Sequence, residues 1–178
     1  MRALPLLAAC GVLLCGCGST ARTSRPGMGL DHRIGLDHRI GVVTFGERKD
    51  RVDAALGPGV SRSPDHLRGA FSFYPQAGIY IGYYAHRGQK YAIAVITHSP
   101  RYRTASGAGV GTTLGQLRKR VNVVCDGDGF THGVLTSPSI DPGHCEHPLN
   151  STNHPFTDFT IDSQTKRVIE VAIFPGGG

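Results

Sequence analysis

Two stretches with the same layout decide the predicted fold: GERKDRVDAALG at residues 46–57 and GTTLGQLRKRV at residues 111–121. Each opens on a glycine and then carries two apolar residues four positions apart, Val52 and Leu56 in the first and Leu117 and Val121 in the second. Apolar residues at this spacing lie on one face of a helix. Each stretch therefore predicts a short helix, and helices this short depend on packing against a sheet for their stability.

The start of the second helix is marked more clearly than the start of the first. Thr113 and Gln116 have the spacing of a capping box, so the second helix is predicted to begin at Thr113. The equivalent position in the first stretch is Arg48, a poor N-cap. Thr44 followed by Glu47 is an alternative that would start the first helix earlier.

Runs of β-branched and aromatic residues follow each predicted helix. The predicted strands are 71–74, 79–84 and 91–97 after the first helix and 156–161 and 167–174 after the second, with turns at 75–78, 85–89 and 163–166. Strands in runs joined by short turns indicate an antiparallel sheet with helices on one face. The predicted fold class is α+β, with two tandem repeats at residues 40–99 and 100–178, each a short helix packed on an antiparallel β-meander.

The doubled pattern of glycine, two residues, short helix and antiparallel meander resembles the β-lactamase-inhibitor-protein-like fold over about residues 40–175. In that group, the small lipoprotein subunit of the outer-membrane β-barrel assembly machinery carries one such unit, and the secreted β-lactamase inhibitor proteins carry two. The resemblance implies a non-enzymatic protein-binding module. No residue of this chain matches a functional motif of either group, so no partner is implied.

The N-terminus is typical of an exported bacterial protein. An uncharged run at residues 3–14 follows Arg2; it is too short to span a bilayer and has the length of a signal-peptide core. It leads into Leu14-Cys15-Gly16-Cys17, which resembles the bacterial lipobox. The resemblance implies that residues 1–16 are a lipoprotein signal peptide and that Cys17 receives the two or three acyl chains of a stable membrane anchor on the extracytoplasmic face. Cleavage before Cys10, or ordinary secretion with cleavage near residues 19–21, are the alternatives.

Residues 17–39 are predicted to hold the lipidated cysteine and a flexible tether, because residues 18–27 are small, polar and contain a proline. The hexapeptide GLDHRI occurs unchanged at 29–34 and 35–40, which indicates a tandem duplication in a region that tolerates insertion. The second copy is predicted to supply Ile40 as the first buried residue of the domain. The repeated Asp-His pairs are a weak candidate for metal binding.

The charge of the chain argues against a nucleic-acid partner. The formal net charge is +6, and removal of residues 1–16 takes away only Arg2, which leaves +5. The basic residues are scattered and form no run of five or six. This distribution is typical of a soluble, solvated surface and leaves weak attraction to anionic headgroups or wall polymers as an alternative.

Cys125 and Cys145 are the only cysteines after residue 17, and in an oxidising compartment they are predicted to form a disulfide. They bound a polar, histidine-rich stretch, 125–155, that is predicted to be a long loop pinned by that bridge. Zinc held by the two cysteines and two histidines, calcium at 126–129, and a Cys125–His132 nucleophile pair are alternatives, and the first and third fail if the cysteines are bridged. Because no catalytic motif is present, we predict no catalytic residues, no metal and no cofactor.

Aromatic residues of the predicted strand 79–84 give the better clue to function. Tyr80 and Tyr84 are predicted to lie on one face with Gly82 between them, and with Phe73 they form the candidate binding surface. Ordinary cross-strand pairing of these tyrosines with Phe71 or Phe73 is the alternative. The predicted function is therefore a cell-envelope lipoprotein that binds another envelope or secreted protein. An envelope metal-dependent hydrolase that uses the histidines of 125–155, and a module for an anionic wall polymer, remain as alternatives.

Overall fold

The computed structural model describes residues 31–125, 143–147 and 154–176. The helices are α1 (Lys49–Leu56) and α2 (Leu114–Arg120). The strands are β1 (Arg33–Gly35), β2 (Arg39–Ile40), β3 (Val43–Thr44), β4 (Val60–Ser61), β5 (Phe71–Tyr74), β6 (Ile79–His86), β7 (Gln89–Thr97), β8 (Arg103–Thr104), β9 (Val124–Cys125), β10 (Gly143–Glu146), β11 (Phe156–Ile161) and β12 (Val168–Phe174). The predicted α+β class is confirmed.

The main sheet has eight antiparallel strands in the order β4-β5-β6-β7-β12-β11-β10-β9. The strands that follow α1 make up one half of this sheet, and the strands that follow α2 make up the other. The halves meet where β7 pairs with β12 in the centre. Four of the five predicted strands have nearly the predicted bounds, and β6 runs on to His86 because Arg87 and Gly88, both at positive φ, close a two-residue turn.

A second, smaller sheet has the order β3-β2-β1-β8, with β1 and β8 parallel. The duplicated hexapeptide supplies β1 and β2, and the isoleucine that ends each copy pairs with the other, Ile34 with Ile40. Both are buried. Residues 31–39 therefore belong to the fold and are not part of a tether, because each copy carries an apolar residue that this small sheet can bury. Among the residues that the structure describes, Ile34 and not Ile40 is the first buried one. Residues 17–30 lie outside the described residues.

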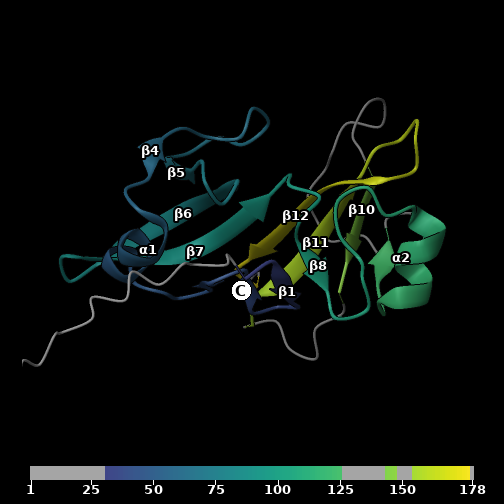
Figure 1. The fold of residues 1–178 in the computed structure, drawn as a ribbon, viewed down its shortest axis with the longest axis horizontal. Helices are drawn as coiled ribbons and strands as arrows, with labels where there is room; N and C mark the ends of the chain where they lie inside the picture. The colour runs from purple at the N-terminus through teal and green to yellow at the C-terminus, as the bar shows by residue number, and fades with distance from the viewer. Residues whose placement is uncertain (1–30, 126–142, 148–153, 177–178) are drawn as a thin grey trace, which may run out of the picture.

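The two helices and the small sheet cover one face of the main sheet. Figure 1 shows α1 and α2 near opposite ends of it, with β1 and β8 between them. Val52 and Leu117 of the helices and Ile40 of the small sheet share one buried cluster with Ile81 and Phe159 of the main sheet. Aliphatic and aromatic burial of this kind is the main source of the stability of the fold. We call the opposite face of the main sheet the helix-free face.

The start of α2 agrees with the prediction, and the start of α1 shows which of its two predicted starts is correct. The capping box at Thr113 and Gln116 is confirmed. At α1 the N-cap is Arg48, without a side-chain hydrogen bond, so the earlier start at Thr44 is wrong. Backbone bonds explain this: residues 45–46 form a turn in which Glu47 donates to the carbonyl of Thr44, and Gly46 and Glu47 bond to Ala92 of β7, so the helix begins only after Arg48.

A buried hydroxyl network fastens α1 to the sheet. Tyr74 is fully buried, and its hydroxyl donates to Asp53 Oδ1 at 2.7 Å and lies 2.7 Å from the hydroxyl of Tyr83. Burial raises the pKa of Tyr83 to about 12, so it stays neutral in this network. Burial also acts to raise the pKa of Asp53, but hydrogen bonds from Lys49 and Tyr74 outweigh it and lower that pKa below its usual value.

The prediction for residues 125–155 is correct for the disulfide and wrong for residues 143–146. The disulfide between Cys125 and Cys145 is present and joins directly opposed residues of β9 and β10. Gly143–Glu146 was predicted to be loop and forms β10, because it pairs with β11 along its whole length. No helix among the described residues has the length and apolar character needed to cross a membrane.

Candidate functional site

The helix-free face carries an aromatic cluster. Tyr80, Ile96 and Ala172 are buried there and contact the partly buried side chains of Leu67, Phe71, Phe73 and Phe174. The predicted division of β6 between two faces is confirmed, since Ile79 and Ile81 belong to the cluster under the helices.

The predicted surface residues differ in exposure. Tyr84 is 56 % exposed, whereas Tyr80 is only 8 % exposed and is therefore no exposed anchor. Its ring lies 4.5 Å from that of Phe73, its direct cross-strand partner, so for Tyr80 the alternative of ordinary pairing holds. A binding surface that includes Phe73 and Tyr84 stays a prediction.

Glycine at position 82 allows an aromatic ring to lie over the strand. A Cβ at Gly82 would meet Phe71 Cε1 at 3.1 Å and the Cβ of Ala94 at 3.2 Å. Both contacts are closer than ordinary van der Waals separation. The sequence pattern Tyr-x-Gly-x-Tyr in β6 therefore leaves room for Phe71 on the helix-free face.

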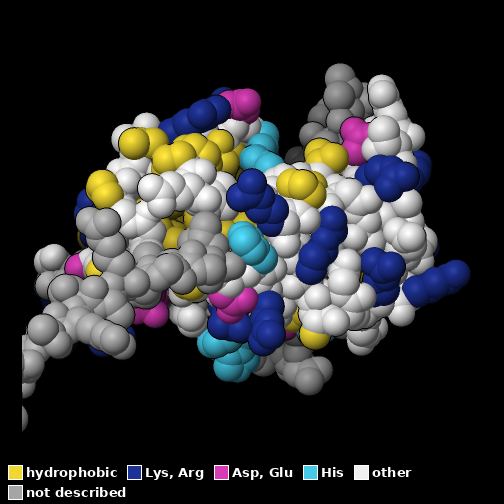
Figure 2. Space-filling view, viewed as in Figure 1, with side chains coloured by type: hydrophobic (Ala, Val, Ile, Leu, Met, Phe, Trp, Pro, Cys, Tyr) yellow, Lys and Arg dark blue, Asp and Glu magenta, His cyan; other side chains and the backbone are white. Residues whose placement is uncertain are grey.

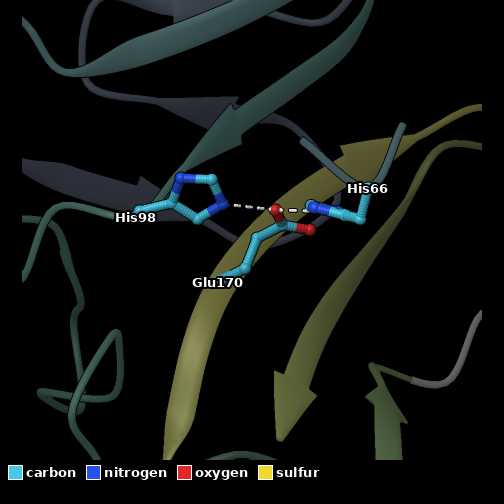
Figure 3. Close-up of side chains that lie close together, drawn as sticks. All are labelled: His66, His98 and Glu170. Carbon is cyan, nitrogen blue, oxygen red and sulfur yellow. Dashed lines mark hydrogen bonds and ion pairs between the residues drawn. The ribbon is translucent and has the colours of Figure 1, made fainter. Parts of the chain in front are cut away.

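Beside the aromatic cluster, three side chains converge on one carboxylate oxygen. His98 Nε2 lies 2.6 Å and His66 Nε2 3.2 Å from Glu170 Oε2. The two imidazole rings approach Glu170 from opposite sides, each with a nitrogen directed at it (Figure 3). Glu170 is 3 % exposed, and the two histidines are about half exposed, which makes this an open-topped site over a buried carboxylate.

These residues come from three separate segments. Glu170 lies in β12, His98 directly follows β7, and His66 lies between β4 and β5. They meet because β7 pairs with β12 and because the segment 62–70 lies over this face, with Leu67 packed on the aromatic cluster.

A second buried carboxylate lies on the same face. Asp158 is 5 % exposed; its Oδ2 is 3.0 Å from His144 Nδ1, and its Oδ1 has no hydrogen-bond partner. The hydroxyl of Thr160 lies 3.4 Å from Asp158 Oδ2 and 3.5 Å from Glu170 Oε1, between the two carboxylates. Burying a carboxylate that lacks full hydrogen bonding costs free energy. Two such carboxylates close together are therefore unusual on a sheet face that has only a structural role.

The predicted candidates in 125–155 do not form a catalytic site among the described residues. Because Cys125 and Cys145 are disulfide-bonded to each other, they cannot ligate zinc or act as a nucleophile. The segment 126–142, with the calcium alternative and His132, lies outside the described residues, as does Cys17. His147 contacts Asp37 Oδ2 at 2.7 Å.

That His147–Asp37 pair has a structural role. Asp37 stands at positive φ in the turn between β1 and β2, and its Oδ1 accepts from the backbone N–H of Thr157 at 2.8 Å. The pair therefore joins the small sheet to β11. The Asp31-His32 pair is not brought together with it into a metal-ligand group in the part of the chain that the structure describes.

Sequence reasoning missed His66, His98 and Glu170. One signal was present: Glu170 is a charged residue inside the strongly apolar run of residues 168–174. A carboxylate at a position that a strand buries calls for a partner. Nothing local in the sequence indicates that the partners are two histidines separated by thirty-two positions.

The visible surface divides by side-chain type. Figure 2 shows hydrophobic side chains gathered mostly over the end of the molecule that holds β4, β5 and β6, while Lys and Arg side chains are spread over both halves of the visible face. Positive charge is therefore dispersed over the visible face, whereas hydrophobic side chains are gathered in one region of it.

Comparisons with protein-family models, with curated proteins and with solved structures found no match. The function of the chain must therefore be inferred from its own residues and their arrangement.

Proposed function

We propose that the chain is a lipid-anchored bacterial cell-envelope protein whose α+β domain is built of two tandem repeats and binds another envelope or secreted protein without catalysing a reaction. The observation that carries the binding role is the aromatic cluster of the helix-free face, with partly exposed Phe71, Phe73 and Phe174 and exposed Tyr84 beside it. Aromatic side chains of this kind are the usual anchors of protein interfaces.

Matching backbone bonds at the two helices support the tandem repeat. Gly46, before α1, donates to the carbonyl of Ala92 at 2.7 Å, and Gly111, before α2, donates to the carbonyl of Val168 at 2.7 Å. Both glycines have a positive φ, 80° and 88°, a conformation that side chains disfavour. In each half the glycine thus ties the start of the helix to the last strand of that half.

The strand pairing supports the same repeat. The hairpin β6–β7 has a register shift between Gly82 and Tyr83, and the hairpin β11–β12 has one between Thr160 and Ile161. Counted in residues along β7 and along β12, both shifts lie at the same distance from the central pair of the sheet, in which Ile96 pairs with Ala172. Two halves related by an approximate two-fold axis through that pair would produce this arrangement.

The disulfide also has a counterpart. In the second half Cys125 and Cys145 are opposed across β9 and β10, and in the first half Ser61 and Ser72 are opposed across β4 and β5. The two serines thus hold the positions that the two cysteines hold in the other half. A doubled unit of helix and antiparallel strands also fits the resemblance to the β-lactamase-inhibitor-protein-like fold, in which two such units present a surface to another protein.

The envelope location is supported by the sequence alone. The lipobox-like residues 14–17 favour an anchor at Cys17 on the extracytoplasmic face, and ordinary secretion is the alternative. The disulfide agrees with either, since both compartments are oxidising.

Crosslinking in intact cells tests the binding role. After mild crosslinking and purification from solubilised envelope, wild-type chain should carry one specific partner, and Tyr84→Ser should recover clearly less of it. Val42→Ser is the matched control, because Val42 is also an exposed apolar residue but lies beside the small sheet. Equal recovery by wild type and both variants would count against the helix-free face as the binding surface. Binding of wall polymer instead, lost with rising salt, would support the polymer alternative.

A further inference from the structure

We propose that His66, His98 and Glu170 bind a zinc ion on the helix-free face. One ligand atom of each residue lies within 4.8 Å of those of the other two. Two imidazoles and one carboxylate are a ligand set that proteins use for zinc with water in the fourth position. This site is separate from the histidines of 125–155, and the proposal does not rest on the protein-binding role proposed above.

The two histidine–carboxylate distances are close to those of a tetrahedral zinc site, and the two imidazole nitrogens lie within 4.8 Å of each other. Zinc bonds of about 2.0–2.1 Å place neighbouring ligand atoms roughly 3.3 Å apart. His66 Nε2 already lies 3.2 Å from Glu170 Oε2. His98 Nε2, at 2.6 Å, has to move outward by less than about 1 Å, and its half-exposed ring at the end of β7 has space to do so.

The charges around Glu170 favour a cation. Among the described residues, Glu170 pairs only with the two histidines and with no Lys or Arg. Asp158, buried nearby on the same face, leaves its Oδ1 without a partner, and Thr160 lies between the two carboxylates. A divalent ion at the histidines would offset the buried negative charge, which imidazole hydrogen bonds alone do only in part.

The donor set selects the type of metal. Imidazole nitrogen suits zinc and neighbouring transition metals, whereas calcium and magnesium require oxygen ligands. The half-exposed histidines leave the remaining coordination positions open to water.

Zinc at this site would fasten one segment of the chain to the sheet. His66 lies in the segment 62–70, which carries Leu67 onto the aromatic cluster, while His98 and Glu170 belong to the central strands. The bound ion would hold this segment in place and so protect the exposed residues Arg62 and Arg68 within it from trypsin.

The test uses the full mature chain without an affinity tag. Wild type should bind one zinc per chain in equilibrium dialysis with zinc alone, and zinc should slow tryptic cleavage after Arg62 and Arg68 several-fold. His66→Ala, which removes an exposed side chain from outside the strands, and Glu170→Gln should each weaken binding by more than about 100-fold, beyond what loss of an outer contact costs. Both should also lose the protection.

The control is His86→Ala, which removes another exposed histidine of the same sheet and should keep full binding and protection. The proposal is overturned if wild type takes up no stoichiometric zinc at micromolar concentration, or if His66→Ala binds zinc as tightly as wild type. Neither result bears on the crosslinking test of the proposed function, so the two can fail separately.

Discussion

Removing the hydroxyl of Tyr74 should destabilise the domain and change how its stability depends on pH. In Tyr74→Phe, Asp53 loses a 2.7 Å hydrogen bond and the hydroxyl of Tyr83 loses its 2.7 Å contact. One such bond contributes about 0.5–1.5 kcal/mol and one to a charged group about 1.5–3 kcal/mol. Since Asp53 is about a third exposed and water replaces part of the loss, we expect about 1–2 kcal/mol.

The sign of the pH effect follows from the carboxylate. The folded-state pKa of Asp53 is lowered, with burial opposing the change and Lys49 and Tyr74 causing it. A lowered pKa contributes stability that is present above the unfolded-state value of about 3.9 and is lost as the pH falls through the folded-state value. Without Tyr74 the lowering is smaller, so the difference between variant and wild type should be largest near neutral pH and should shrink in acid.

Denaturant unfolding at several pH values measures both effects. In thermal unfolding at neutral pH, the melting temperature of the variant should fall by roughly 2–8 °C. Tyr102→Phe is the matched control, since its buried hydroxyl donates to a neutral acceptor, the carbonyl of Ala77, at 2.9 Å. That variant should lose stability by an amount that does not change in acid. Equal pH dependence of the two losses, or no loss in Tyr74→Phe, would show that the Tyr74 hydroxyl does not stabilise the carboxylate of Asp53.

Three further predictions concern the cysteines. Replacing Cys125 and Cys145 by serine should cost about 3 kcal/mol in denaturant unfolding, since the bridge closes a loop of 20 residues; an unchanged midpoint would contradict the bridge. If the halves are equivalent, Ser61→Cys with Ser72→Cys should form a second disulfide on air oxidation, seen by intact mass; two free thiols in the folded variant would count against the equivalence. Cys17→Ser should leave an unlipidated precursor outside the normal anchored fraction, and unchanged mass and fractionation would contradict the lipobox reading.

The sequence predicted the elements whose signal is local. Val52 with Leu56 and Leu117 with Val121 marked both helices, because a helix face repeats every three to four residues. The same holds for the aromatic and β-branched runs of β5, β6, β7, β11 and β12.

It failed where structure depends on distant partners. β10 has polar residues around Cys145 and forms only because β11 and the disulfide hold it. The sequence predicts a tether where β1 forms, because three residues with one isoleucine carry no periodic signal, and Ile34 is buried only by long-range packing.

The site shows the same limit. Tyr80 was expected to be exposed, yet Phe73 and the segment 62–70 cover it. His66 and His98 meet Glu170 through the pairing of β7 with β12, which joins the two halves of the chain and leaves no trace in local spacing. A charge in an apolar strand was the one available sign.

Site-specific photo-crosslinking can show whether the helix-free face contacts another protein in the cell. A photoreactive phenylalanine analogue would replace Tyr84, 56 % exposed beside the aromatic cluster, or Arg51, whose side chain is 72 % exposed on α1 at the other face. After illumination of intact cells, we expect a discrete adduct with another protein from position 84 and none from position 51. Adducts from position 51 alone, or in equal yield from both positions, would contradict a binding role for the helix-free face.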